Sequence, residues 1–145
     1  MDGKSVKLPG GDLALAAIDT GTTLIGGPTA AVDALWNAVP GSVALSGNLA
    51  GMFAFRKSSS PPLPSARALW NFDSLSLAIR TACSSQLSIA FSFGGPSWPI
   101  NLADLNLGSI SNGRCLGAIF DITQGSGIAI GNGQPAWIIG DTFLV

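Results

Sequence analysis

The chain has 145 residues, of which 47% are hydrophobic and 10% are charged, with 19 Gly, 9 Pro and a net charge of −1. This length fits one domain with its own core, and the composition favours many short strands and turns. The charge balance argues against binding of nucleic acid or of an anionic membrane, and the absence of histidine excludes histidine-activated nucleophiles and zinc sites built on imidazole.

The first part of the chain leads to a single carboxylate. Residues 3–12 predict a short strand or hairpin, and residues 13–19 predict an apolar strand that ends in Asp19. A carboxylate at such a place is costly to desolvate without partners. The turn that follows offers hydroxyl donors and a permissive glycine, in the order Thr20, Gly21, Thr22 and Thr23. We predict that this turn holds the Asp19 carboxylate by hydrogen bonds.

A helix and two strands are predicted next. Thr29 is expected to cap a helix over residues 30–38, on which Trp36 faces the core. Residues 42–55 carry apolar side chains on both sides of a Gly-Asn pair, which predicts two short strands joined by a turn at residues 47–48.

The composition changes abruptly at residues 56–82. This Ser/Pro-rich segment contains four of the chain's seven cations and a single acid, Asp73. It cannot bury enough apolar surface to offset the entropy of ordering, so we predict a disordered or linker segment. A regulatory or partner-binding loop with a short helix over residues 69–79 is the functional alternative.

The remaining predicted elements alternate strands and turns. They are a strand over residues 87–93, a turn at 94–96, a strand over 97–100, a helical turn over 101–105, a strand over 115–122 and a glycine-rich loop over 124–134. The glycine-rich loop is followed by neither a lysine nor a helix signal, so it does not predict phosphate binding.

The two cysteines are Cys83 and Cys115. They cannot form a four-thiolate metal site, and their separation suits a disulfide of an oxidising compartment, worth roughly 3–4 kcal/mol, although two unrelated buried thiols remain the alternative. The sequence has no apolar run long enough to span a bilayer, and its first residues lack the apolar core of a signal peptide. The disulfide and the missing signal peptide therefore disagree, unless the true N-terminus lies upstream of Met1.

Two stretches together resemble the pepsin-like aspartic proteases. Residues 16–25 resemble the family's second catalytic motif, two apolar residues followed by Asp-Thr-Gly-Thr-Thr/Ser. Residues 137–144 resemble its late apolar-apolar-Gly segment, which packs beside the catalytic loop and here contains Ile138, Ile139 and Gly140. The resemblance is closest to the fungal secreted members and covers only their C-terminal lobe.

This resemblance implies a fold and a bridge. The fold is a single all-β, mainly antiparallel lobe with one or two short helices, incomplete at its C-terminus because the chain stops at Val145. The family places the first cysteine soon after a strand like residues 51–55, so the resemblance favours a Cys83–Cys115 disulfide and makes residues 56–82 an insertion. Translated intron sequence is a further explanation of that insertion.

The resemblance also implies a chemistry. Asp19 would be one of two catalytic aspartates that share a proton and activate a water against a peptide bond. Thr20 would join the threonine grip beneath the pair, Gly21 and Thr22 would orient the carboxylate, and Thr23 would line the substrate cleft. No metal and no cofactor are expected.

The second half of this machinery is absent from the sequence. No other Asp-Thr-Gly or Asp-Ser-Gly occurs, and there is no tyrosine for the family's flap. Three hypotheses follow: one lobe of a secreted or vacuolar endopeptidase that is completed by an N-terminal lobe, a one-motif protease that is active as a homodimer, or a non-catalytic β-domain that binds a peptide or protein. In the third, Asp19 is only a satisfied turn carboxylate.

Overall fold

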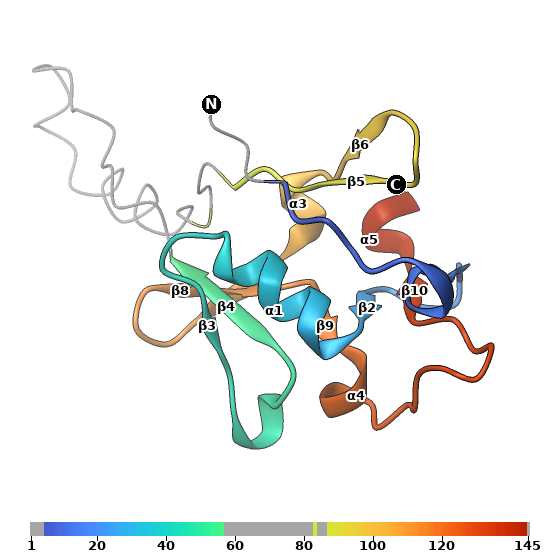
Figure 1. Cartoon of the computed structure of the whole chain (residues 1–145). Helices are drawn as coiled ribbons and strands as arrows, with labels where there is room; N and C mark the ends of the chain where they lie inside the picture. Colours follow the sequence, from blue (N-terminus) through green and yellow to red (C-terminus); the bar gives the residue numbers. More distant parts are fainter. Residues whose placement is uncertain (1–4, 57–82, 84–86, 145) are drawn as a thin grey trace, which may run out of the picture.

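The computed structural model describes residues 5–56, 83 and 87–144 (Figure 1). Its strands are β1 (Ala16–Ile18), β2 (Ile25–Gly27), β3 (Val43–Ala44), β4 (Phe53–Arg56), β5 (Ala90–Ser92), β6 (Ser97–Pro99), β7 (Asn106–Ile110), β8 (Arg114–Gly117), β9 (Ile119–Asp121) and β10 (Trp137–Ile139). Its helices are α1 (Thr29–Asn37), α3 (Leu102–Leu105), α4 (Ile122–Gly125) and α5 (Asp141–Leu144), with 3₁₀ turns at Gly11–Ala14 and Gly47–Leu49.

The strands form three small sheets, with orders β1-β10-β2-β9, β3-β4-β8-β7 and β5-β6. Five of the seven strand pairings are antiparallel, and the parallel ones join β1 to β10 and β2 to β9. Of the helices described, only α1 exceeds four residues. The prediction of a mainly antiparallel β fold with few short helices is confirmed.

The first sheet brings distant parts of the chain together. Strand β10 lies between β1 and β2, so that Ile139 is opposite Ile18 on one side and Ile25 on the other. Ile25 and Ile139 are almost completely buried, whereas Ile18 on the edge strand keeps 58% of its surface exposed. The sheet is therefore anchored at its centre and open along β1.

Helix α1 covers the core through Trp36, as its apolar spacing predicted. This side chain is fully buried, donates its indole N–H to the carbonyl of Ile119 at 3.0 Å, and stacks on Phe53 and Phe55. The predicted cap is wrong: the helix begins at Thr29 itself, after Pro28. The Thr29 hydroxyl instead lies 2.8 Å from the hydroxyl of Thr123.

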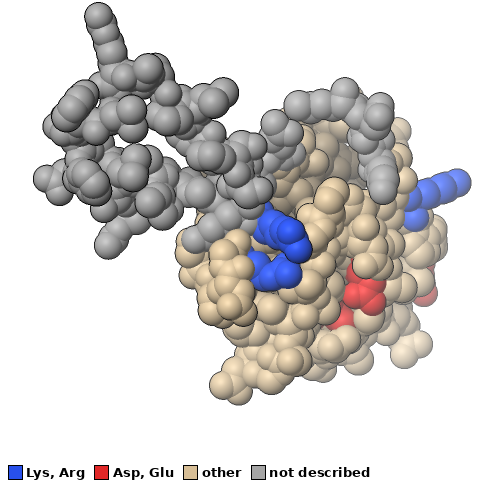
Figure 2. Space-filling view, turned by 90° about the vertical axis from the view of Figure 1, so that its left-hand side faces the viewer, with Lys and Arg blue, Asp and Glu red and all other residues tan. Residues whose placement is uncertain are grey.

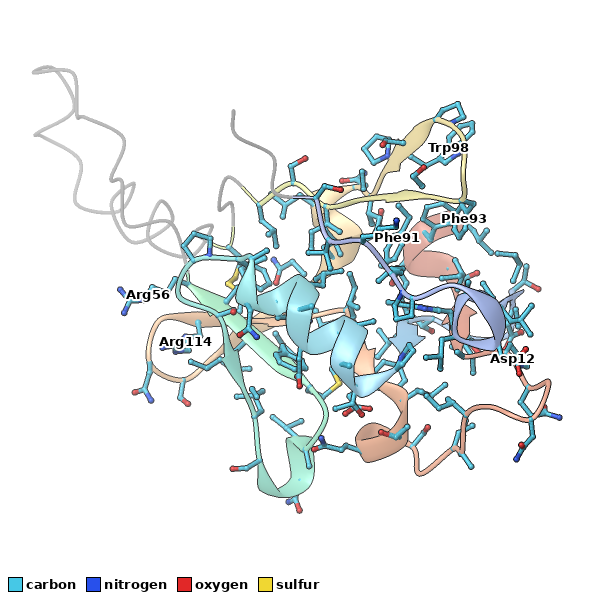
Figure 3. All side chains as sticks on the ribbon, viewed as in Figure 1. Asp12, Arg56, Phe91, Phe93, Trp98 and Arg114 are labelled. Carbon is cyan, nitrogen blue, oxygen red and sulfur yellow. A yellow bond between two sulfur atoms is a disulfide. The ribbon has the colours of Figure 1, made fainter. Side chains whose placement is uncertain are left out.

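The predicted disulfide is present. Cys83 and Cys115 are bonded with Cα atoms 6.0 Å apart. Cys115 is paired with Phe55 across β4 and β8, and the next pair along is Arg56 with Arg114, whose side chains lie near each other in Figure 3. The predicted disordered segment and its helix over residues 69–79 lie outside the described residues, apart from Arg56.

Two strand predictions are wrong in their limits. Residues 5–10 form no strand. Of the strand expected over 13–19, only β1 forms, because the chain first makes the 3₁₀ turn that starts at Gly11 with φ +70°. The strand expected over 115–122 is divided at Ala118, whose N–H donates to Leu105 and whose carbonyl accepts from Ile25. These two bonds lead the chain from β8 in one sheet to β9 in another.

The other predicted elements form, with one limit too wide and one omission. The two strands around residues 47–48, the β5–β6 hairpin and the helical turn α3 are all present, but β5 covers only Ala90–Ser92 of the strand expected over 87–93. Strand β7 was not predicted, because Asn106 and Gly108 are poor strand formers, and its pairing with β8 contains an irregularity after Asn106.

The β5–β6 ribbon packs on α5 and β10 through aromatic rings. The Phe91 ring meets Trp137 and Phe143 edge-on, with centroids 5.6 and 6.1 Å away, and Phe93 and Trp98 are each 55% exposed (Figure 3). On the face drawn in Figure 2, most of the described surface belongs to residues other than Lys, Arg, Asp and Glu.

Candidate active site around Asp19

Asp19 lies directly after β1, at the place where the chain leaves the first sheet. Its backbone N–H donates to the carbonyl of Ile139 at 3.0 Å, which extends the parallel pairing of β1 with β10 by one residue. Thr22 N–H then donates to the Asp19 carbonyl at 3.2 Å and closes a tight turn. The position of the carboxylate is thus determined by a strand that lies far away in the sequence.

Both carboxylate oxygens of Asp19 accept hydrogen bonds within this turn. Gly21 N–H donates to Oδ1 at 2.9 Å, and the Thr22 hydroxyl donates to Oδ2 at 2.5 Å. The Thr22 hydroxyl foremost, and then the Gly21 N–H, hold the pKa of Asp19 below its ordinary value. The side chain is only partly buried, so the ionised carboxylate is reached by solvent.

The segment around Gly140 clamps this turn from the other side. The N–H groups of Asp141 and Thr142 donate to the carbonyls of Thr22 and Thr23 at 2.8 and 2.9 Å, and the Thr142 hydroxyl reaches the Thr23 carbonyl at 2.8 Å. A Cβ atom at Gly140 would overlap the carbonyl oxygen of Thr22. Only glycine allows the two segments to approach this closely.

The structure therefore brings the two resembling stretches into contact. Ile139 is buried and Ile138 is half-buried in β10, and Gly140 touches the turn. Thr20 and Thr23 have exposed side chains beside the carboxylate, and within the described part neither hydroxyl makes a hydrogen bond to protein. Their assigned roles stay predictions.

A second aspartate was not singled out by the sequence patterns. Asp121 ends β9 and is 1% exposed. Its Oδ1 accepts from the N–H and the hydroxyl of Thr123 at 2.9 and 2.6 Å and from Gln124 N–H at 3.3 Å, which caps α4. Oδ2 has no partner among the described residues. The available signal was an Asp followed two positions later by Thr, the spacing of an Asx turn or helix cap.

Burial and hydrogen bonding act in opposite directions on Asp121. Burial favours its neutral form, but the hydroxyls of Thr123 and Thr29 and the N–H groups of Thr123 and Gln124 outweigh this and lower its pKa. Asp121 therefore has a lowered pKa, like Asp19, but its side chain is closed off from solvent.

The arrangement gives one accessible, ionised carboxylate on an open edge. Such a group can accept a proton from a water and polarise it for attack. Within residues 5–56, 83 and 87–144, no three His, Cys, Asp or Glu side chains gather as a metal site requires. In the same residues no helix has the length and apolar character needed to cross a membrane.

Comparison with known proteins decides the family. The model of the eukaryotic aspartyl protease family matches residues 2–145. The chain belongs to this family. Among curated members, it is similar to an aspartic protease of Phaffia rhodozyma, with 31% identity over 131 residues that cover 89% of this chain and 24% of that protein.

Another similar family member is the major aspartyl peptidase 1 of Cryptococcus neoformans var. grubii. The identity is 28% over 151 aligned positions, which cover 99% of this chain and 24% of that protein. This aspartyl protease chain thus spans about a quarter of the length of the curated relatives it matches.

Proposed function

We propose that this chain supplies Asp19 as one of the two catalytic carboxylates of an aspartic endopeptidase that is secreted or vacuolar. Its substrates are polypeptides, as the family implies. The second carboxylate comes from an N-terminal lobe of the same enzyme or from a second copy of this chain, because the 145 residues contain one Asp-Thr-Gly.

The observation that carries the proposal is the combination of hydrogen bonding and exposure at Asp19. Its Oδ1 accepts the Gly21 N–H at 2.9 Å and its Oδ2 accepts the Thr22 hydroxyl at 2.5 Å. The side chain is nevertheless only partly buried, so solvent can reach the carboxylate. Fixed donors keep a catalytic group oriented without reorganisation during the reaction, which lowers the activation barrier.

The chemistry requires the second carboxylate at close range. Two carboxylates about 3 Å apart cannot both ionise, so they share one proton, and aspartic protease pairs are themselves the best-known example. The ionised member takes a proton from water as this attacks the peptide carbonyl, and the protonated member hydrogen-bonds the developing oxyanion. The donors on Asp19 favour its ionised form, but in the assembled enzyme the titration belongs to the pair.

The surroundings of Asp19 suit a substrate. Thr20 and Thr23 expose hydroxyls, and Ile18 is 58% exposed directly before the carboxylate. We assign Thr23 to the substrate cleft and Thr20 to the contact with the second catalytic loop. The exposed apolar edge of β1 would then be covered in the assembled enzyme.

The test is peptide hydrolysis at acid pH by the chain alone, over a wide concentration range, with Asp19→Asn as the matched control. We expect no turnover from the chain alone, and turnover once a lobe with the second Asp-Thr-Gly or Asp-Ser-Gly is supplied. Pepstatin-sensitive activity that rises with dimer concentration and is lost in Asp19→Asn would instead assign the second carboxylate to another copy.

A non-catalytic binding domain is the competing function. The observation in its favour is that Asp19 already has partners for both oxygens inside its own turn. If the domain is not catalytic, Asp19→Asn leaves the turnover of the assembled enzyme unchanged. That result would overturn the proposal that Asp19 is a catalytic carboxylate.

A further inference from the structure

Two Asn-Gly pairs form tight turns at the surface. Asn112 and Gly113 have φ values of 60° and 66°, and Asn132 and Gly133 have values of 55° and 80°. Two successive residues with positive φ are the signature of a type I′ turn, for which Asn-Gly is the favoured sequence. Both asparagine side chains are exposed to solvent.

At both turns, the asparagine side-chain amide and the backbone N–H of the following glycine, which could react with each other, are free of hydrogen bonds to the described protein. In the described part of the chain, neither the side-chain amides of Asn112 and Asn132 nor the N–H groups of the glycines after them make a hydrogen bond to protein. Two other asparagines differ: Asn101 and Asn106 accept backbone N–H groups at 3.0 and 2.9 Å and are followed by leucine.

This juxtaposition allows an intramolecular reaction. The backbone nitrogen of the glycine loses its proton and attacks the Cγ atom of the asparagine; a new C–N bond forms, the bond from Cγ to the amide nitrogen Nδ2 breaks, and ammonia leaves. Water then opens the five-membered imide at either carbonyl and gives aspartate or isoaspartate. Glycine has no Cβ to hinder the attack, and the proton loss makes the reaction faster at higher pH.

The two turns differ in how firmly they are held. Asn112 connects β7 and β8, beside the Ile110–Arg114 pair and next to the disulfide-bonded Cys115. Asn132 is flanked by one isolated bridge between Gly131 and Gln134. The attack requires the backbone to rotate out of the turn geometry. Because fewer backbone pairings hold the turn at Asn132, we expect this rotation, and therefore the reaction, to be faster there than at Asn112.

We propose that Asn132 is a site of spontaneous deamidation and converts faster than Asn112. The product adds a negative charge and, as isoaspartate, one extra backbone methylene. The altered turn lies shortly before Ala136 and Trp137, whose N–H groups both donate to the carbonyl of Leu15, directly before β1. The modification therefore reaches the strand pair that positions Asp19, although it involves no residue of the proposed active site.

The experiment follows the folded full chain at pH 8, with the reduced, unfolded chain incubated in parallel. After reduction, trypsin separates the two sites, because Arg114 is the last cation in the sequence and Asn132 is the only asparagine after it. Mass spectrometry then measures amide-to-acid conversion in peptides 81–114 and 115–145, and fragment ions locate it. We expect conversion at Asn132 to be several-fold faster than at Asn112, with Asn101 and Asn106 unchanged.

Asn132→Gly is the matched control, because Gly-Gly also fits a type I′ turn. This variant should show no conversion in peptide 115–145 and an unchanged urea midpoint. The proposal is overturned if Asn132 in the folded chain is intact when the unfolded chain has converted, or if Asn112 converts first.

Discussion

The turns at Asp19 and Asp121 have similar hydrogen bonds to the carboxylate, but they differ in whether the surrounding structure relies on that carboxylate. Asp19 directly follows β1 and Asp121 ends β9, and each carboxylate accepts a backbone N–H from two residues further on and a threonine hydroxyl. The Asp19 turn is additionally clamped by backbone groups at Gly140, whereas Asp121 is buried and itself caps α4. We therefore expect that the fold depends more on the carboxylate of Asp121 than on that of Asp19, which agrees with the catalytic role proposed for Asp19.

The largest effect is expected where the clamp itself is broken. Gly140→Ala places a Cβ on the Thr22 carbonyl, so the backbone of one segment must move, and we expect a loss of about 3–5 kcal/mol, as for severe overpacking. Urea unfolding measures it. Gly95→Ala is the matched control, since a Cβ there meets no atom within 4 Å. Equal midpoints for the two variants would show that the Asp19 turn is not held by this approach.

Removal of the buried carboxylate comes next. Asp121→Ala takes away the cap of α4 and leaves the N–H groups of Thr123 and Gln124 without an acceptor, so we expect about 2–3 kcal/mol of destabilisation. Asp33→Ala on the exposed face of α1 is the control and should be near neutral. If Asp121→Ala changed the free energy of unfolding as little as Asp33→Ala does, the fold would not depend on the Asp121 carboxylate, and the proposed difference between Asp121 and Asp19 would be wrong.

A smaller loss is expected for Thr123→Val. Its hydroxyl links Asp121 to Thr29 at 2.6 and 2.8 Å, and the isosteric valine deletes both bonds at a cost of about 1–2 kcal/mol. The same unfolding assay applies. The equivalent change in the other turn, Thr22→Val, should shift the urea midpoint less, because solvent can replace the bond to Asp19. A greater loss for Thr22→Val would contradict the comparison.

The pH dependence of stability should separate the two carboxylates more finely. Both pKa values are lowered in the folded chain, so their contributions are present above the unfolded value of about 3.9 and are lost as pH falls through the folded pKa. Unfolding midpoints measured from pH 6 downward should fall less steeply in Asp121→Asn than in the wild type. Asp19→Asn should follow the wild-type curve closely, since solvent screens the exposed group. The reverse order would contradict the account.

The sequence was informative where local patterns decide the structure. The spacing around Trp36 predicted a buried helix, alternation predicted the β5–β6 hairpin, and the Asp-Thr-Gly turn predicted a held carboxylate. Pairing between Cys83 and Cys115 followed from the family resemblance together with the composition.

The misses share a non-local cause. Ala118 belongs to an alternating apolar pattern, but its hydrogen bonds to Leu105 and Ile25 end one strand and start another. The same pattern concealed Asp121, because it places this residue inside a strand and gives no sign of a buried cap. The insertion of β10 between β1 and β2 joins segments more than a hundred residues apart. No periodicity predicts this strand order, and only the family resemblance indicated that residues 137–144 lie beside the Asp19 turn.

The central claim is that the fold spares the Asp19 carboxylate and catalysis uses it. The most direct measurement compares wild type with Asp19→Asn in the assembled enzyme, with turnover at acid pH and the urea midpoint determined on the same preparations. The account predicts an unchanged midpoint and the loss of turnover. Retained turnover, or a midpoint lowered as far as in Asp121→Ala, would contradict it.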